Sequence, residues 1–470
     1  MYRRWFLCAC VSFMAIGGCA VHKQAVLSTP QGQALAASQA KALEARSLDD
    51  PQLRQWMTTS AGVQPASWPL TNWDLSELTL AAYYFSPEMD VARANAAVSD
   101  AAIITAAMKP NPSINFGSGY ETALESPYLL MFDFSLPIET AGKRGYRIAE
   151  AQHLSAAGRI QVAATAWAVR SHVRAAMVNF VLAEELAALL QKQEAEQSKY
   201  VELLVARFRA GEIPLPDVTS ARIDLTNLRQ ALRTAEGQVG TAHSAVAAAI
   251  GIPDSSLRGK NLNWSAIDQP PNPGTLAAPE IRAAAIENRL DVKRSLAQFE
   301  AAQSRLQLEL ARRHPDIHLG PGYAFEEGAH LISLQLGAVL PLRNRNEGPI
   351  AEAEAQRKAA GVQLLSTQST VIADSDKALA QYNAAFSVLE EARRSTTQAE
   401  QQRQTANQWL KSGEADQLTA ISADIQAEVA ERARLQAIQQ VQLALGSLED
   451  ALQRPVDPAS TPALPKKSPR

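Results

Sequence analysis

The most constraining feature of this 470-residue chain is that it contains two similar halves in tandem. Residues 111–120 match residues 314–323, with Pro, Ile, both Gly and Tyr at corresponding positions and an offset of 203. Further matched segments keep the same order at offsets of 201 to 204: 90–91 with 291–292, 136–138 with 340–342, 148–151 with 350–353, and 208–212 with 410–414. Internal repetition of this kind predicts a fold with two quasi-equivalent halves of about 200 residues.

Each half is predicted to contain a helix, a β-hairpin, a long helix and a return helix. The first long helical segment, 146–209, contains no proline, and at 1.5 Å per residue it would extend about 95 Å. Small and apolar residues recur along it at spacings of three and four, as in a coiled-coil seam. The predicted bounds are a first repeat at 74–260 (helix 74–108, hairpin 113–137, return helix 217–250), a proline-rich linker at 261–279, and a second repeat at 280–454 (hairpin 316–341, long helix 349–411, return helix 416–453).

The hairpins have the alternating pattern of β-strands. Leu130, Phe132 and Leu136 alternate with small or polar residues, and the second copy repeats this pattern. The return strands of about ten residues have the length of a tilted membrane strand, although a half-buried soluble strand shows the same alternation. Each chain offers four such strands, and because about eight are the least that close a barrel, a membrane-spanning structure requires strands from several chains.

The N-terminus has the pattern of a bacterial lipoprotein signal. Arg3 and Arg4 precede an apolar stretch, 5–16, that is too short to cross a bilayer, and Ile-Gly-Gly-Cys at 16–19 resembles a lipobox. The alternative is an ordinary secretory signal with a chance cysteine. The lipoprotein interpretation predicts a signal peptide at 1–18, a lipid on Cys19, and an extended, lipid-anchored segment at 19–73. Ala20 in place of Asp favours delivery to the outer membrane. The proline-rich tail, 455–470, is predicted to be disordered.

Composition argues against a nucleic-acid-binding protein, and the absence of catalytic motifs argues against an enzyme. Lys and Arg total 45 against 48 Asp and Glu, so the chain has no excess of positive charge for binding nucleic acid. The sequence contains no Gly-x-Ser-x-Gly elbow, His-Glu-x-x-His motif or Rossmann glycine fingerprint, so no enzyme is predicted. His314 and His318 are four residues apart, but Pro315 lies between them at a strand start, so no metal site is predicted.

Two segments that follow the hairpins carry a family resemblance. They are Leu-Pro-Ile-Glu-Thr-Ala-Gly-Lys-Arg-Gly at 136–145 and Pro-Leu-Arg-Asn-Arg-Asn-Glu-Gly-Pro-Ile at 341–350. Over residues 70–454 the chain resembles the TolC-type outer membrane factors, and within them the CzcC-type branch associated with heavy-metal-cation efflux.

The resemblance implies an α+β membrane protein with an internal tandem repeat. Three chains with four strands each would form a homotrimeric twelve-stranded barrel, which long antiparallel helices continue as a coiled-coil tunnel across the periplasm. Such ducts are not enzymes. They pass cargo from an inner-membrane pump of the RND type through a periplasmic adaptor (membrane fusion) protein, in contact with outer-membrane lipid. No cofactor is expected apart from the covalent lipid on Cys19, and nucleic acid is not expected as a partner.

The resemblance also assigns roles to the two helix-to-helix turns. Gly211 and Glu212 in one turn, and Gly413 and Glu414 in the other, match the family's adaptor-contacting tip motif. The alternative is that both glycines merely end helices. Asp217, Glu414 and Asp416 follow the turns, and threefold symmetry would gather each into a ring of candidate gate acids. For any one of them, a solvated surface position is the simpler alternative.

Alternative functions remain open at this point. A duct for drugs, organic solvents or secreted peptides would have the same architecture. A coiled-coil lipoprotein scaffold without a pore would also fit the long helices, but it would have no need for alternating strands between them.

Overall fold

The computed structural model describes residues 29–65, 67–120, 122, 128–264 and 266–456. The chain divides into one unit that ends at Arg46 and another that starts at Ser47. In the first unit, α1 spans Thr29–Glu44. Cys19, the predicted signal peptide and all but two residues of the predicted tail lie outside the described residues. Among the described residues, every helix is too short or too polar to cross a membrane.

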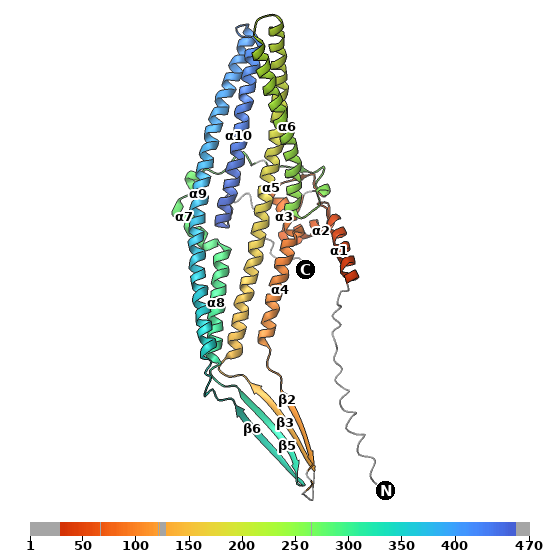
Figure 1. Cartoon of the computed structure of the whole chain (residues 1–470), viewed down its shortest axis with the longest axis vertical. Coiled ribbons are helices and arrows are strands. Elements are labelled where there is room, and N and C mark those ends of the chain that lie inside the picture. Colours follow the sequence, from red (N-terminus) through yellow and green to blue (C-terminus); the bar gives the residue numbers. More distant parts are fainter. Residues whose placement is uncertain (1–28, 66, 121, 123–127, 265, 457–470) are drawn as a thin grey trace. The chain divides into compact units, whose positions relative to one another are not determined.

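The second unit is built around two long helices and their return helices (Figure 1). The long helices are α5, Lys143–Arg209, and α9, Glu347–Ser412, and the return helices are α6, Leu215–Ile250, and α10, Gln417–Leu452. Helix α6 packs on α5, α10 packs on α9, and α10 also packs on α5. The 67 residues of α5 correspond to a rise of about 100 Å. The predicted long-helix and return-helix arrangement is therefore confirmed.

The helix predicted at 74–108 is two helices, α3 (Leu75–Phe85) and α4 (Pro87–Ala107). Pro87 lacks a backbone N–H and has a fixed φ, so it is tolerated at the first turn of a new helix but interrupts a continuing one. The second repeat breaks at the same place, between α7 (Ala278–Asn288) and α8 (Leu290–Ala311). Both helix pairs start 203 residues apart, so the predicted match of 90–91 with 291–292, at offset 201, is wrong by two residues.

The four predicted strands form one antiparallel sheet with the order β2-β3-β5-β6. Their bounds are Ser113–Tyr120, Tyr128–Ile138, Ile317–Glu326 and Ala329–Ala338. The register places Phe116 opposite Phe132, Phe132 opposite Tyr323, and Tyr323 opposite Ile332, so large apolar residues share one face of all four strands. The other face carries small and polar residues such as Asp133, as the alternation predicted.

The helices follow the strands in the same order. Helix α4 leads into β2, β3 leads into α5, α8 leads into β5, and β6 leads into α9. The side-by-side contacts are α4 on α5, α5 on α8, and α8 on α9 (Figure 1). A layer of four helices and a sheet of four strands therefore share one order, and the join between the two repeats, α5·α8 and β3·β5, lies in the middle of both.

The segment 19–73 was predicted to be extended, and its described part contradicts this. Helix α2 (Pro51–Trp56) is followed by a π-helical turn (Met57–Ala61) and by β1 (Asn72–Trp73). Asp50 accepts a hydrogen bond from the Gln52 N–H and Pro51 occupies the first helical turn, which together form a standard helix start that the sequence already contained. Leu53, Met57 and Trp73 are buried in the core with α3, α5 and α6.

The proline-rich linker also folds onto the body of the protein. Its first residues form β4 (Asn261–Leu262), which pairs in parallel with β1. Further along, Ile267 is buried among residues of α5, α7, α9 and α10, and Pro271 accepts a hydrogen bond from the hydroxyl of Tyr382. Lys260 forms an ion pair with Asp49 at 2.6 Å. The connection between the repeats is thus fixed at both its ends rather than free.

Candidate functional site: the helix turns and the seam between the repeats

The two turns that join long and return helices have the same backbone geometry. Gly211 and Gly413 each have φ of +79°, in the left-handed region that favours glycine. In the first turn Glu212 N–H donates to the Arg207 carbonyl at 2.9 Å, and in the second Glu414 N–H donates to the Trp409 carbonyl at 2.8 Å. These are the long-range hydrogen bonds of a Schellman motif, which satisfy carbonyls at the end of a helix. Both glycines therefore end a helix and reverse the chain.

One ion pair joins the two turns across the repeats. The Arg207 guanidinium, near the end of α5, contacts the Asp416 carboxylate at the start of α10, and its Nε lies 3.9 Å from Glu212 Oε2. Leu418 of α10 also packs against the apolar cluster of the first turn, which includes Val201 and Val218. The turns of the two repeats are therefore held together by one charged contact and by apolar packing.

Asp416 is the most constrained of the three candidate gate acids. Its Oδ1 accepts hydrogen bonds from the Thr419 hydroxyl at 2.7 Å and from the Thr419 N–H at 2.9 Å, so it caps α10. The two Thr419 hydrogen bonds and the Arg207 guanidinium lower the pKa of Asp416 to about 2. The carboxylate is ionised at physiological pH and already paired with a basic side chain. Asp416 therefore holds the two turns together through its ion pair with Arg207.

The other predicted residues of the turns lie on the surface. Asp217 is exposed in the first turn of α6, and Glu414 is exposed beyond Gly413. Phe208, Trp409 and Leu215 are large apolar residues close to these glycines and are also exposed. The turns therefore present apolar and acidic side chains together, a combination that suits contact with another protein. The acids were predicted from the sequence, and the aromatic residues were not.

A second group of residues, which sequence analysis missed, lies at the seam between the repeats. Arg170 and Arg174 of α5 are buried around Glu449 of α10, with Arg170 Nη2 3.0 Å and Arg174 Nε 3.6 Å from Glu449 Oε2. Burial lowers the pKa of Arg174, and the nearby Glu449 opposes that shift. Arg174 also donates to the Gln442 side chain at 2.9 Å. Breaking such a pair leaves an uncompensated buried charge, so the seam fixes α10 against α5.

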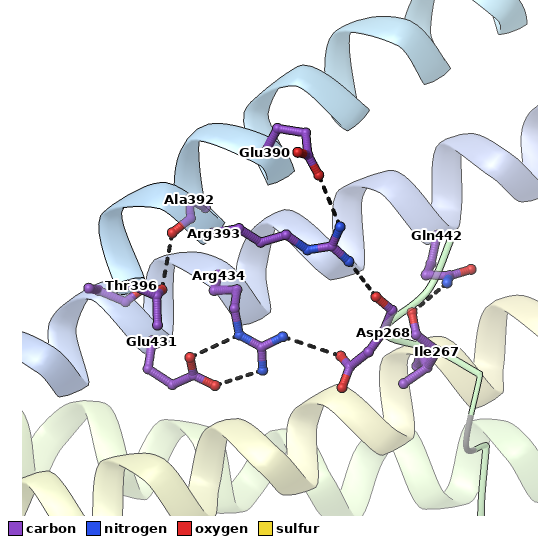
Figure 2. A network of polar contacts seen from close by, with 10 residues as sticks. Ile267, Asp268, Glu390, Ala392, Arg393, Thr396, Glu431, Arg434 and Gln442 are labelled. Carbon is purple, nitrogen blue, oxygen red and sulfur yellow. Dashed lines mark hydrogen bonds and ion pairs between the residues drawn. The ribbon is translucent and has the colours of Figure 1, made fainter. Parts of the chain in front are cut away.

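Polar contacts tie the linker to α9 and α10 in the same region (Figure 2). The Gln442 side-chain amide donates to the Ile267 carbonyl at 2.5 Å, and Arg393 donates to the Asp268 carbonyl at 2.5 Å. Arg434 reaches the Asp268 carboxylate at 3.5 Å and forms a second ion pair with Glu431 at 2.7 Å. The linker therefore acts as a strap that holds the two helices of the second repeat.

The helix-to-sheet junction contains a third polar cluster, formed by the segment that carried the family resemblance. Lys143 is buried, and its Nζ lies 2.7 Å from the Asp316 carboxylate and 2.6 Å from the His314 carbonyl. Burial raises the pKa of Asp316, but hydrogen bonds from Lys143 and from the Thr140 N–H outweigh it, so the net pKa is lowered. The start of α5 in one repeat is thereby tied to the start of β5 in the other.

One buried acid stands apart from these networks. Glu428 of α10 is buried, and Lys192 Nζ lies 3.5 Å from its Oε1, while neither carboxylate oxygen has a hydrogen-bond donor among the described residues. Burial raises the pKa of Glu428, only partly opposed by Lys192. Within the described residues no group of three or more His, Cys, Asp or Glu side chains could hold a metal ion.

A family model described as "Outer membrane efflux protein" matches residues 82–252. A search of curated proteins finds no significant match. Three similar solved structures are the outer membrane protein VceC from Vibrio cholerae (18% identity, TM-score 0.64, 82% of this chain and 97% of that one), the outer membrane channel CmeC from Campylobacter jejuni (14%, 0.62, 80% and 85%), and the outer membrane channel MtrE from Neisseria gonorrhoeae in its open state (16%, 0.63, 82% and 89%).

These matches define the class of the fold. The chain has the fold of outer-membrane efflux channels, with long antiparallel helices and a four-stranded contribution to a sheet, as the resemblance predicted. The three solved structures named above are described as an outer membrane protein and two outer membrane channels.

Proposed function

We propose that the protein is the outer-membrane duct of a tripartite efflux system. Three copies would pool their strands into a twelve-stranded barrel and their helices into a periplasmic tunnel, with Cys19 carrying the lipid. A periplasmic adaptor would contact the turns at Gly211 and Gly413, and an inner-membrane pump of the RND type would supply the energy.

One observation carries this proposal: the helix layer and the sheet have the same order. Helix α4 and strand β2 lie at one edge, and helix α9 and strand β6 lie at the other. An open sheet edge leaves backbone N–H and C=O groups unpaired, which hydrocarbon does not tolerate. A closed ring of copies removes the open edges of the sheet and of the helix layer together. The outward apolar face supports the same arrangement, since Ile332, Leu334 and Leu336 are all exposed in the single chain.

The turns supply a mechanism for a gate. Arg207 and Asp416 hold the turns of the two repeats together, and charged groups that draw neighbouring helix ends inward would narrow the tunnel at this end. Docking of an adaptor on the exposed apolar residues beside them would compete with this contact. Asp217 and Glu414 remain candidate ring acids in the assembled trimer.

The test is planar-bilayer conductance of the purified protein, with its mass measured in the same preparation. Discrete conductance steps from a trimer are the expected result, either for the wild type or, if its turns are closed, for the Arg207→Ala variant. A monomer without conductance would overturn the proposal. A trimer silent in both forms would leave no basis for a duct.

The cargo that we propose is heavy-metal cations, supported by the resemblance of 136–145 and 341–350 to the CzcC-type branch. The test is growth of a deletion strain, with and without the gene, on a panel of divalent heavy-metal salts and a panel of organic drugs. Restored tolerance to the metals alone is expected. Restored tolerance to drugs or solvents alone would assign the duct to a different pump.

A further inference from the structure

Two buried polar side chains lie between α5 and α10, closer to the turns than the arginine cluster is. Glu428 of α10 is 4% exposed and Gln193 of α5 is 5% exposed. Both carboxylate oxygens of Glu428 and the side-chain oxygen of Gln193 are buried without a hydrogen-bond donor among the described residues. Buried acceptors without a donor are costly and uncommon in native proteins, so these three oxygens need a partner.

Gln193 belongs to the face of α5 that packs on the second repeat. Val178 and Leu182 on this face are buried in one apolar cluster with residues of α9 and α10. Gln193 follows them by fifteen and eleven residues, close to four and three helical turns. Its chain neighbour Lys192 reaches α10 as well, with Nζ 3.5 Å from Glu428 Oε1. The two unpartnered side chains are therefore level with each other across the contact between α5 and α10.

An ionised Glu428 is poorly compensated by the charges around it. Lys192 is the base that pairs with it, but the Lys192 side chain is 59% exposed and 3.5 Å is longer than a normal hydrogen bond. Burial raises the pKa of Glu428, and the nearby acids Glu196 and Asp424 raise it further. The surroundings therefore favour the neutral form of this carboxyl.

Helix α9 contributes a base that is already paired. Arg403 lies 2.8 Å from Glu400, and this acid raises the pKa of Arg403 more than Glu428 does. A metal ion is not a suitable ligand, because the described residues hold no group of three acids or histidines for one and the Lys192 ammonium would repel it. A proton converts one Glu428 acceptor into a donor, and Gln193 offers the acceptor for it.

We propose that Glu428 is a proton-binding site, and that its protonated carboxyl donates a hydrogen bond to Gln193 Oε1 when α10 packs on α5. The proton removes a buried charge and gives the Gln193 oxygen its donor. Separation of the two helices returns the carboxyl to water, where it ionises more readily. Acid therefore strengthens the contact between α5 and α10, and α10 is the helix that brings Asp416 to Arg207.

The pH dependence of thermal stability tests the site. A group that holds its proton more tightly in the folded chain stabilises the fold below the pKa of the unfolded chain, and this stabilisation is lost as the pH rises through the folded pKa. Glu428→Gln keeps the shape of the side chain and a donor for Gln193, but it does not ionise. We expect the Tm advantage of Glu428→Gln over the wild type to be at least about 2 °C larger at pH 8 than at pH 5.

Glu202→Gln is the matched control, because it makes the same substitution at an exposed acid of α5. Its Tm difference from the wild type should be the same at both pH values, since an exposed glutamate is mostly ionised at pH 5 and at pH 8. A Glu428→Gln difference that is equally independent of pH would overturn the proposal, because Glu428 would then be ionised between the helices, with or without a bound water.

Gln193→Leu tests the acceptor. A hydrogen bond made by the neutral carboxyl favours that form, so its loss should lower the midpoint at which Glu428 titrates. The midpoint is measured from the infrared absorption of the protonated carboxyl, as the difference between each protein and the same protein carrying Glu428→Gln. We expect a midpoint above the ordinary value of 4.5 in the wild type and a lower one in Gln193→Leu. A wild-type midpoint at or below 4.5 would overturn the site, and an unchanged midpoint in Gln193→Leu would overturn the hydrogen bond.

Both measurements use the purified full-length protein in detergent and require no pore. A protein that titrates as expected but conducts no ions would keep the proton site and lose the proposed duct. A conducting trimer without the titration would lose the proton site and keep the duct.

Discussion

Asp416 shows how one carboxylate can serve both a helix start and a contact between repeats. Its pKa of about 2 lies below the ordinary value near 3.9 for an unfolded chain. A lowered folded pKa means that the carboxylate contributes stability above about pH 4 and loses it as the pH falls through about 2. The Arg207–Asp416 pair is therefore intact across the whole physiological range. We expect closed-state conductance of the wild type to be the same at pH 7 and pH 5, and a rise at pH 5 would contradict this assignment.

Asp416→Asn separates the two roles of this residue. Asparagine caps helices about as well as aspartate, so the start of α10 should be kept while the charge opposite Arg207 is lost. We expect a higher open probability in bilayers with little change in thermal stability, because an exposed ion pair contributes at most about 1 kcal/mol. Asp224→Asn, at an exposed position further along α6, is the control. Equal conductance of the two variants would show that the Arg207–Asp416 ion pair does not hold the tunnel closed.

Gly446 of α10 lies beside the buried side chain of Arg174. A Cβ added at this position would lie 2.7 Å from Arg174 Nη1, which also donates to the Gln442 carbonyl at 2.5 Å and so has little freedom to move. Gly446→Ala is expected to destabilise the fold by about 2 kcal/mol, measured by urea unfolding. Gly240→Ala, in the middle of α6 with open space around it, should be neutral or stabilising by up to about 1 kcal/mol. Equal effects would mean that the arginine cluster tolerates displacement.

Residue-level contacts of this kind could not be read from the sequence. Arg170, Arg174 and Glu449 are charged residues in helical sequence, where a solvated surface is the ordinary expectation, and their meeting requires the register of two helices almost 280 residues apart. The same holds for Arg207 and Asp416. The glycines of the turns were predictable because reversal of a helix requires a left-handed residue locally.

At the scale of elements, the two turns should be more sensitive than their exposure suggests. Gly211→Val and Gly413→Val place a β-branched residue at φ of +79°, at a backbone cost of about 1–2 kcal/mol each. We expect loss of export with normal trimer yield, scored as growth on the cargo and as trimer in membranes. Gly259→Val has the same strain, with φ of +78° and open space, but lies far from the turns in sequence. Loss of export in Gly259→Val as well would show that strain alone is responsible.

Periodicity determined how well each element could be predicted. The long helices and the hairpins persist for many residues with one clear period, and they were predicted to within a few residues. The helix break before Pro87 and the short elements between residues 50 and 73 were missed. A short helix has too few turns to produce a period, so only its cap, here Asp50 with Pro51, could have indicated it.

At the scale of the whole molecule, lipid attachment at Cys19 is a prediction independent of the duct. Cys19→Ala should leave an unprocessed, unlipidated precursor, detected by intact mass, because the thiol that accepts the lipid is absent. The control is Cys10→Ala, which lies inside the predicted signal and should be processed normally. Wild-type and Cys19→Ala chains that differ in mass only by the substituted side chain would refute the lipid.

The strap between the repeats has a consequence for how a ring could arise. Lys260, Asp268 and Ile267 keep the two halves of one chain in a fixed relation before any second chain arrives. Each association of separate molecules costs upwards of about 4 kcal/mol in translational and rotational freedom, and joining the halves covalently removes that cost at every second contact around the ring. The duplication also lets the two halves diverge. A ring of separate identical halves would repeat every mutation at every position, whereas this chain can hold Arg207 in one turn and Asp416 in the other.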